Sequence, residues 1–257
     1  MESKAYRLRE FILPTAPKSE WSLIVDASAG LMLGALPGLV DFSAALVPIL
    51  PLADGIVVSP GQARKLSRRT KAEAALLVRG DWTNALRGRD FVLPAETIAH
   101  LTLIDPPEAL ELGASALVSY FLLGFEEQVE ADCLKTTVQL ALQGRQAGLP
   151  LIGDVLPIGP RIVLPNKAIE LSVSYVIEGG ADGVAVPWSG RGTLETILKM
   201  AAGLPVWIKP SSLGDAVQEL EEALSLGATG CWLNERLFAV ADPAAFVESL
   251  RLALYGL

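Results

Sequence analysis

The segment from Gly180 to Lys209 reads GADGVAVPWSGRGTLETILKMAAGLPVWIK and alternates short apolar runs with a longer helical stretch. The runs GVAV and VWIK have the length and composition of strands that are buried on both faces of a sheet. Gly180 and Gly203 stand shortly before these runs, where glycine supplies the left-handed turn that ends a helix. The segment therefore predicts a strand–helix–strand unit with parallel strands.

The same junction recurs along the chain, which has 257 residues. Helical segments that end in glycine precede apolar runs near positions 116, 150, 183, 205 and 230, and earlier apolar runs occupy 22–28, 55–59 and 74–79. These evenly spaced strands predict a single α/β domain over 1–257, a (β/α)8 TIM barrel with a short N-terminal helix that closes one end. The alternative is an open doubly wound sheet, but no G-x-G-x-x-G motif follows the first run. Residues 101–105 form either an extra strand or part of a helix–loop excursion.

Composition narrows the classes of function. The net charge of −8 argues against nucleic acid as a partner, because phosphate binding needs clustered Lys and Arg. No apolar stretch is long enough to span a membrane and no signal peptide is evident, so we expect a cytoplasmic protein. Cys133 and Cys231 lie in apolar segments and are interpreted as reduced core residues. The mean hydropathy of +0.41 fits a barrel buried on both faces and predicts a homo-oligomer.

Lys209 is the most informative single residue, because it ends a strand that should be buried. In a barrel of this kind, polar residues at the carboxyl ends of the strands face the active site. A desolvated lysine there can act as a Schiff-base nucleophile. The alternative is a structural lysine paired with Asp26 or Asp154. A carboxylate within ion-pair reach of the ammonium would favour the structural role, whereas an apolar, open surround would favour the nucleophile.

Asp26 and Asp154 end two other strands and are predicted to act as general bases or as ligands of a substrate hydroxyl. Equally, each carboxylate can cap the loop or helix that follows. Further polar residues near strand ends are predicted to bind substrate, and they are Ser28, Arg79, Trp188, Ser189, Ser211, Asn234 and Arg236. The turn 189–193, SGRGT, is interpreted as a helix cap centred on Thr193, with an anion cradle as the alternative.

His100 is the only histidine of the chain, and no other ligand stands near it at metal-binding spacing. The aspartates are dispersed along the sequence, so neither a metal nor any other cofactor is predicted. His100 also falls outside a strand end, which argues against Ser-His-Asp chemistry.

Several segments, in order along the chain, resemble class I aldolases of the DeoC and archaeal-type fructose-bisphosphate aldolase group. They are IVDAS at 24–28, GALPGLVD at 34–41, LADGIVV at 52–58, AGLPLI at 147–152, GADGVAVPWSG at 180–190 and LNERLFAVADP at 233–243. The resemblance implies a TIM barrel with aldehyde-lyase activity on a small carbonyl or anionic metabolite.

The chain departs from this family at its functional positions. The family's Schiff-base lysine falls at Ala185, its tyrosine at Leu156 and its first-strand histidine at Ala27, whereas its first-strand aspartate is kept as Asp26. The phosphate-binding glycines of the seventh strand are replaced by Pro-Ser-Ser, so a sugar bisphosphate is not expected. A single anionic group remains possible, held by Arg79, Arg191 or Arg236.

The stretch IKPSS at 208–212 is similar to the KPAGG strand of deoxyribose-phosphate aldolases, where a second lysine assists the first. This similarity leads to one hypothesis, a lyase with Lys209 as a relocated Schiff-base nucleophile and Asp26 or Asp154 as proton carrier. The alternative is a non-catalytic or metabolite-binding barrel that has lost the imine chemistry. A third hypothesis is acid–base catalysis by carboxylates without an imine.

Overall fold

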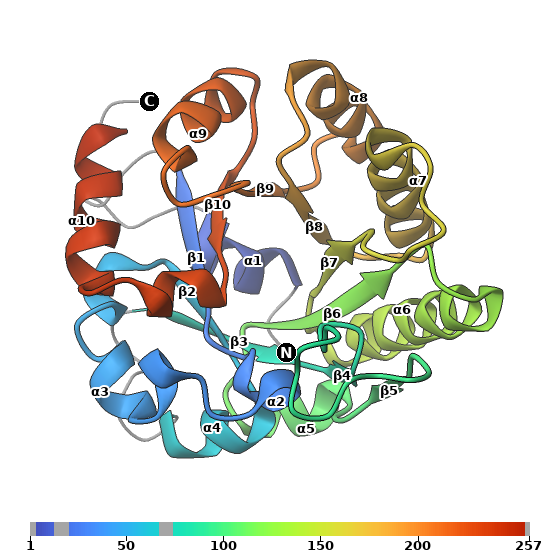
Figure 1. Cartoon of the computed structure of the whole chain (residues 1–257), viewed down its shortest axis with the longest axis horizontal. Coiled ribbons are helices and arrows are strands. Elements are labelled where there is room, and N and C mark those ends of the chain that lie inside the picture. Colours follow the sequence, from blue (N-terminus) through green and yellow to red (C-terminus); the bar gives the residue numbers. More distant parts are fainter. Residues whose placement is uncertain (1–3, 13–20, 67–73, 255–257) are drawn as a thin grey trace.

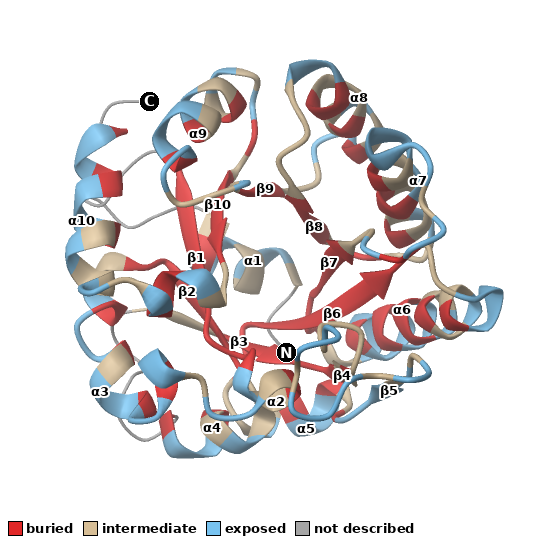
Figure 2. Cartoon of the chain, viewed as in Figure 1, coloured by how far each residue is buried: buried red, intermediate tan, exposed pale blue. Residues whose placement is uncertain are grey.

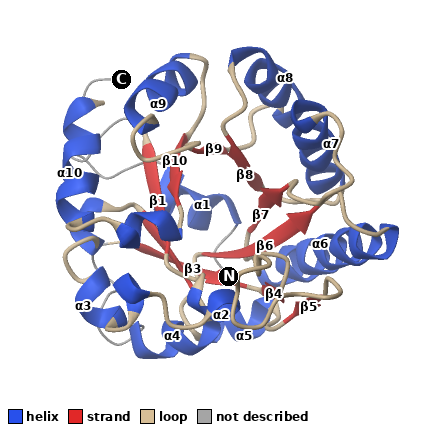
Figure 3. Ribbon diagram, viewed as in Figure 1, coloured by secondary structure: helices blue, strands red, loops and turns tan. Residues whose placement is uncertain are grey.

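The computed structural model describes residues 4–12, 21–66 and 74–254. Its centre is a closed barrel of eight parallel strands, in the order β1-β10-β9-β8-β7-β6-β3-β2 (Figures 1 and 3). The strands are β1 (Ser22–Asp26), β2 (Gly55–Val58), β3 (Ala75–Arg79), β6 (Ala116–Leu122), β7 (Leu151–Leu156), β8 (Gly183–Pro187), β9 (Val206–Lys209) and β10 (Gly230–Leu233). The predicted TIM barrel is confirmed, and the open sheet is excluded.

Helices surround the barrel on its outside (Figure 3). They are α2 (Gly30–Leu33), α3 (Phe42–Leu46), α4 (Pro60–Leu66), α5 (Pro106–Glu111), α6 (Glu127–Ala147), α7 (Pro165–Glu178), α8 (Arg191–Ala201), α9 (Ala216–Ser225) and α10 (Pro243–Ala253), with short 3-10 turns η1 (Pro37–Leu39), η2 (Leu50–Leu52) and η3 (Glu235–Ala239). Gly180 and Gly203 have φ angles of 96° and 93°, as the junction pattern predicts. Within the described ranges, no helix is long and apolar enough to cross a membrane.

The barrel interior near the amino ends of the strands is a mainly apolar layer, in which the buried Ser22 hydroxyl accepts from Trp207 Nε1 at 3.0 Å. Trp207 and Trp232 meet edge to face there, with ring centroids 6.3 Å apart, and both side chains are buried. Figure 2 shows the barrel strands as mostly buried elements and the surrounding helices as partly exposed. Helix α1 (Lys4–Ile12) lies across this end of the barrel and inserts Phe11, whose ring stacks on Trp207 at 5.7 Å. The expected N-terminal helix therefore closes the barrel. Ala185 packs in the same layer, on the sixth barrel strand.

The chain between β3 and α5 leaves the barrel and forms a small antiparallel pair. Strand β4 (Asp81–Thr83) pairs with β5 (His100–Thr102). The stretch 101–105 is thus partly an extra strand, while Asp105 already belongs to the capping box of α5. This pair brings His100 against the side of the barrel.

Candidate active site

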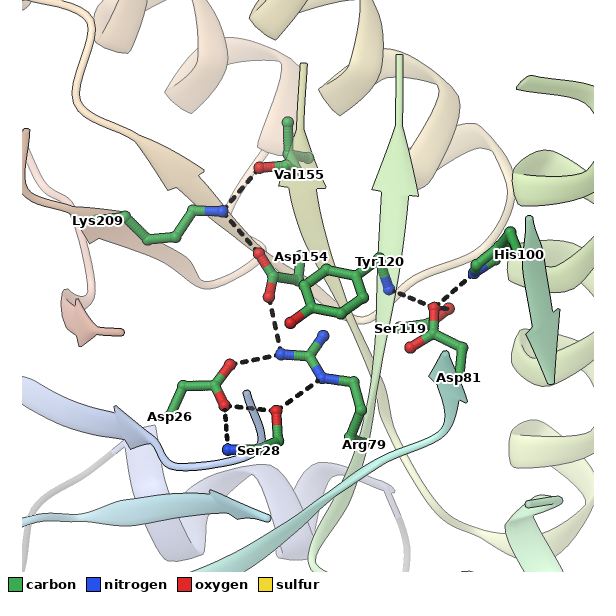
Figure 4. Close-up of polar contacts among 10 residues, drawn as sticks. All are labelled: Asp26, Ser28, Arg79, Asp81, His100, Ser119, Tyr120, Asp154, Val155 and Lys209. Atoms are coloured by element: carbon green, nitrogen blue, oxygen red, sulfur yellow. Dashed lines mark hydrogen bonds and ion pairs between the residues drawn. The ribbon is translucent and has the colours of Figure 1, made fainter. Parts of the chain in front are cut away.

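The barrel interior near the carboxyl ends of the strands holds a buried ionic network. It is centred on Arg79, the last residue of β3 (Figure 4). Its Nη2 atom donates to Asp26 Oδ2 at 2.5 Å and to Asp154 Oδ2 at 2.9 Å, and its Nε donates to Ser28 Oγ at 3.2 Å. The guanidinium carbon lies 3.7 Å from the centroid of the Tyr120 ring. Burial opposes the charge, but Tyr120 and the two carboxylates outweigh it and raise the pKa of Arg79.

Lys209, at the end of β9, joins the network through Asp154. Its Nζ donates to Asp154 Oδ1 at 2.6 Å and to the carbonyl oxygen of Val155 at 2.7 Å. Burial acts to raise the pKa of Asp154, but Lys209 and Arg79 outweigh it and lower that pKa, so the carboxylate is ionised. The group next to the Lys209 ammonium is therefore a carboxylate, and this is the environment that favours a structural role for the lysine.

Asp26, at the end of β1, takes the capping role that was one of its two predicted roles, and it also pairs with Arg79. Its Oδ1 accepts hydrogen bonds from the backbone N–H of Ser28 at 2.9 Å and from Ser28 Oγ at 2.6 Å, so it caps the loop that follows. Its Oδ2 binds Arg79. Five predicted site residues from four strands thus form one network, and they are Asp26, Ser28, Arg79, Asp154 and Lys209.

The predicted binding residues Ser211, Asn234 and Arg236 bond to one another and to helix α9. Ser211 donates from its backbone N–H to Glu219 Oε2 at 2.8 Å and from its hydroxyl to Glu219 Oε1, and its carbonyl accepts from Arg236 at 2.8 Å. Asn234 accepts the backbone N–H of Arg236 at 3.2 Å. Glu219, on α9, was not predicted from the sequence, because helix residues facing a neighbouring turn carry no local motif.

The turn at 189–193 differs from its predicted capping role. Helix α8 begins at Arg191, Gly190 is its N-cap with φ of 83°, and no side-chain hydrogen bond caps it. Thr193 is buried inside the helix instead. The carbonyl of Ser189 accepts from Asn166 at 3.2 Å, and the backbone N–H of Trp188 binds the carbonyl of Lys209 at 2.8 Å. The prediction of a helix cap centred on Thr193 is therefore wrong.

Glu235 is a titratable residue at the barrel mouth that our set of predicted site residues missed. It directly follows Asn234 after β10 and is partly buried. Burial raises the pKa of its carboxyl; a backbone N–H and Arg236 oppose this, while Asp26 and Asp154 add to it. The signal in the sequence was its place immediately after a strand, since a carboxylate there faces the mouth.

His100 has buried partners that its sequence surroundings did not reveal. Its Nε2 lies 2.7 Å from Asp81 Oδ2, and its Nδ1 lies 3.4 Å from the sulfur of Cys133 on α6. Asp81 also accepts from Ser119 Oγ at 2.8 Å and from the backbone N–H of Tyr120 at 2.6 Å (Figure 4). These partners come from other elements of the fold, so the spacing of residues around His100 in the sequence does not reveal them. Cys133 and Cys231 are free and buried, as predicted.

The His100–Asp81 pair predicts a pH dependence of stability. Burial opposes the imidazolium, but the hydrogen bonds to Asp81 and Cys133 outweigh it and raise the pKa of His100 from 6.5 to about 10. A raised pKa in the folded state stabilises the protein fully below pH 6.5, and this stabilisation is lost as the pH rises through about 10. The advantage of the native chain over a His100→Gln variant, measured by urea unfolding, should shrink across this interval.

His100 is the only histidine, so its imidazole signal can be followed directly by NMR over the same interval. A midpoint near the ordinary value of 6.5 would contradict the buried ion pair.

Comparison with known proteins relates both sequence and fold to enzymes. No family model matches the chain. It is 24% identical over 238 residues to a 2-amino-3,7-dideoxy-D-threo-hept-6-ulosonate synthase of Halobacterium salinarum, covering 91% of this chain and 86% of that protein. It is 21% identical over 244 residues to a 3-hydroxy-5-phosphonooxypentane-2,4-dione thiolase of Salmonella typhimurium, covering 93% and 79%. The fold matches a solved archaeal fructose 1,6-bisphosphate aldolase with a TM-score of 0.78 and 21% identity, over 98% and 99% of the two chains.

Proposed function

We propose that this chain, whose sequence and fold are those of an aldolase-superfamily barrel, is an aldolase-like lyase that acts on a small carbonyl metabolite. Lys209 is the nucleophile and Asp154 the first proton carrier. The observation that carries this proposal is the position of Lys209 at the carboxyl end of β9, 2.6 Å from Asp154 and 9% exposed. Ala185, on the neighbouring strand, has no nucleophilic side chain, so the amine comes from Lys209.

The two cationic partners of Asp154 bind different oxygens, so Arg79 keeps the carboxyl group in place when Lys209 loses a proton to it. Lys209 binds Oδ1 and Arg79 binds Oδ2. Transfer of one ammonium proton to Oδ1 frees the amine and leaves the carboxyl group hydrogen-bonded to Arg79. The amine then attacks the carbonyl carbon. Asp154 passes two protons in turn to the carbonyl oxygen, the one taken from the ammonium and one lost by the attacking nitrogen, so the oxygen leaves as water and an iminium remains.

Carbon–carbon cleavage follows from the resulting iminium, which accepts the electron pair of the breaking bond. The substrate hydroxyl next to that bond must lose its proton as the aldehyde product forms. Asp26 and Glu235 are the carboxylates at the mouth for this step, and burial raises the pKa of Glu235, which makes its carboxylate a stronger base. Arg79 holds Asp26 and Asp154 in place on opposite sides of its guanidinium.

A second candidate is a metabolite-binding barrel without imine chemistry. The two acceptors of the Lys209 ammonium, Asp154 and the carbonyl of Val155, favour it, because both stabilise a charged lysine. In that case a carbonyl ligand binds the mouth without a covalent step.

Borohydride trapping separates the two candidates. The chain is incubated with acetaldehyde, pyruvate, hydroxyacetone or dihydroxyacetone, reduced, and mapped by mass spectrometry. We expect an adduct on the peptide that contains Lys209, lost in Lys209→Met. Lys167→Met is the matched control, since Lys167 is an exposed lysine paired with Glu170. No adduct at Lys209 with any of the four compounds would favour the binding barrel.

A further inference from the structure

A cavity of about 380 Å³ lies beside the ionic network, over the carboxyl ends of β1 and β2. The loops and short helices that follow these strands enclose it, and α2, α3 and α4 lie on this side of the barrel (Figure 1). Leu39 and Phe42 supply apolar walls, while Ser28, Ser59 and Gln62 supply polar groups. Its size suits a small metabolite or one arm of a larger one.

The cavity is joined to the proposed reaction centre through Ser28. This serine lines the cavity, donates to Asp26 at 2.6 Å and accepts from Arg79 at 3.2 Å. A molecule that fills the cavity therefore contacts Ser28, a member of the buried network. A substrate with its carbonyl at Lys209 can extend its other end in this direction.

The described residues that line the cavity are all uncharged. Phosphate recognition in proteins relies on Arg, Lys or several free backbone N–H groups. At the turn after β9, Arg236 donates to the Ser211 carbonyl, and the N–H and hydroxyl of Ser211 are both taken by the Glu219 carboxylate. A dianionic group therefore has no cationic side chain to bind among the described residues that line the cavity, whereas a neutral group needs none.

The polar groups of the cavity match hydroxyl groups. The carboxamide oxygen of Gln62 is buried and has no hydrogen-bond partner, and buried acceptors are normally satisfied. Rotation of the terminal amide about its last side-chain bond presents this oxygen to a ligand. Ser59 Oγ accepts the backbone N–H of Gln62 at 3.3 Å, so its own proton remains available for donation.

We propose that this cavity binds the uncharged, polyhydroxylated arm of the substrate. The assignment of this arm to a substrate rests on the proposed lyase function, but the binding itself does not. The names of two relatives include a phosphonooxy group, so a neutral arm is a departure from those enzymes.

The test uses Lys209→Met protein, which cannot form an imine, titrated with ribitol and with ribitol 5-phosphate in ligand-observed NMR. We expect ribitol to bind at least about tenfold more tightly than its phosphate, a difference of about 1.4 kcal/mol. Adding Gln62→Leu should weaken ribitol binding by about tenfold, which corresponds to loss of one or two hydrogen bonds. Gln128→Leu, on the exposed start of α6, is the matched control and should leave binding unchanged.

Ser59→Ala supplies a second variant if Gln62→Leu does not fold. Tighter binding of the phosphate, no binding of ribitol, or equal binding by both cavity variants and the parent would overturn the proposal. These outcomes are independent of borohydride trapping, so loss of the neutral-arm site and loss of the lyase function can be told apart.

Discussion

Arg79→Met is expected to lower the free energy of unfolding by about 3–5 kcal/mol. Arg79 is fully buried and neutralises Asp26 and Asp154 from between them. Without it, Asp26 has no cationic partner in the network, and a buried carboxylate without compensation is strongly destabilising. The measurement is urea unfolding followed by tryptophan fluorescence and circular dichroism.

The loss of unfolding free energy in Arg79→Met should depend on pH. In the native chain the pKa of Asp154 is lowered below 3.8, so its contribution to stability is present above that pH and is lost as the pH falls further. Protonation of both carboxylates removes the penalty, so native and variant stabilities should converge in acid.

Two further variants control the Arg79 experiment. Asp26→Asn in the Arg79→Met background should restore part of the lost stability, because the stranded charge is gone. Arg161→Met removes an exposed ion pair with Glu127 and should cost less than about 1 kcal/mol. An Arg79→Met protein as stable as the native chain would refute the buried network.

Lys209→Met is expected to abolish exchange of the α-protons of dihydroxyacetone in D₂O. An imine at Lys209 acidifies these protons, so the native chain should catalyse their exchange, which is visible by ¹H NMR. Loss of the nucleophile should reduce the rate at least about 10³-fold, equivalent to about 4 kcal/mol. Stability should fall by only about 1–3 kcal/mol, since Asp154 keeps its bond to Arg79.

Lys209→Arg is the matched control, because arginine keeps a positive charge near Asp154 but forms no imine. It should lose proton exchange as completely as the methionine variant while remaining closer to native stability. Proton exchange that persists in Lys209→Arg would assign the chemistry to another group. Glu235 would then be the first residue to substitute. No exchange by the native chain with any carbonyl compound would support the binding barrel.

Much of the fold was predictable because its signals are local. Each strand is a short apolar run, and glycines such as Gly180 and Gly203 end the helices before them. Barrel geometry then sends the ends of all strands to one face, which is why Asp26, Asp154 and Lys209 could be proposed together from positions far apart in the chain.

The partners of these residues could not be predicted in the same way. His100 meets Asp81 and Cys133 only because β4 and β5 fold back against α6, and Ser211 meets Glu219 only where α9 turns toward the end of β9. No spacing rule connects such pairs. These contacts form only because the β4–β5 pair folds back after β3 and because α9 packs beside the end of β9.

The sequence alone therefore determined the barrel, its closing N-terminal helix and which side chains end its strands, because strand and helix periodicity are local properties of the chain. Only the tertiary structure decided that Lys209 is paired with Asp154, that Arg79 lies between two carboxylates and that Glu235 is partly buried beside them. Charge state and reactivity depend on the field of neighbouring groups and on exclusion of water. Those neighbours come from distant segments, so they exist only once the barrel has closed.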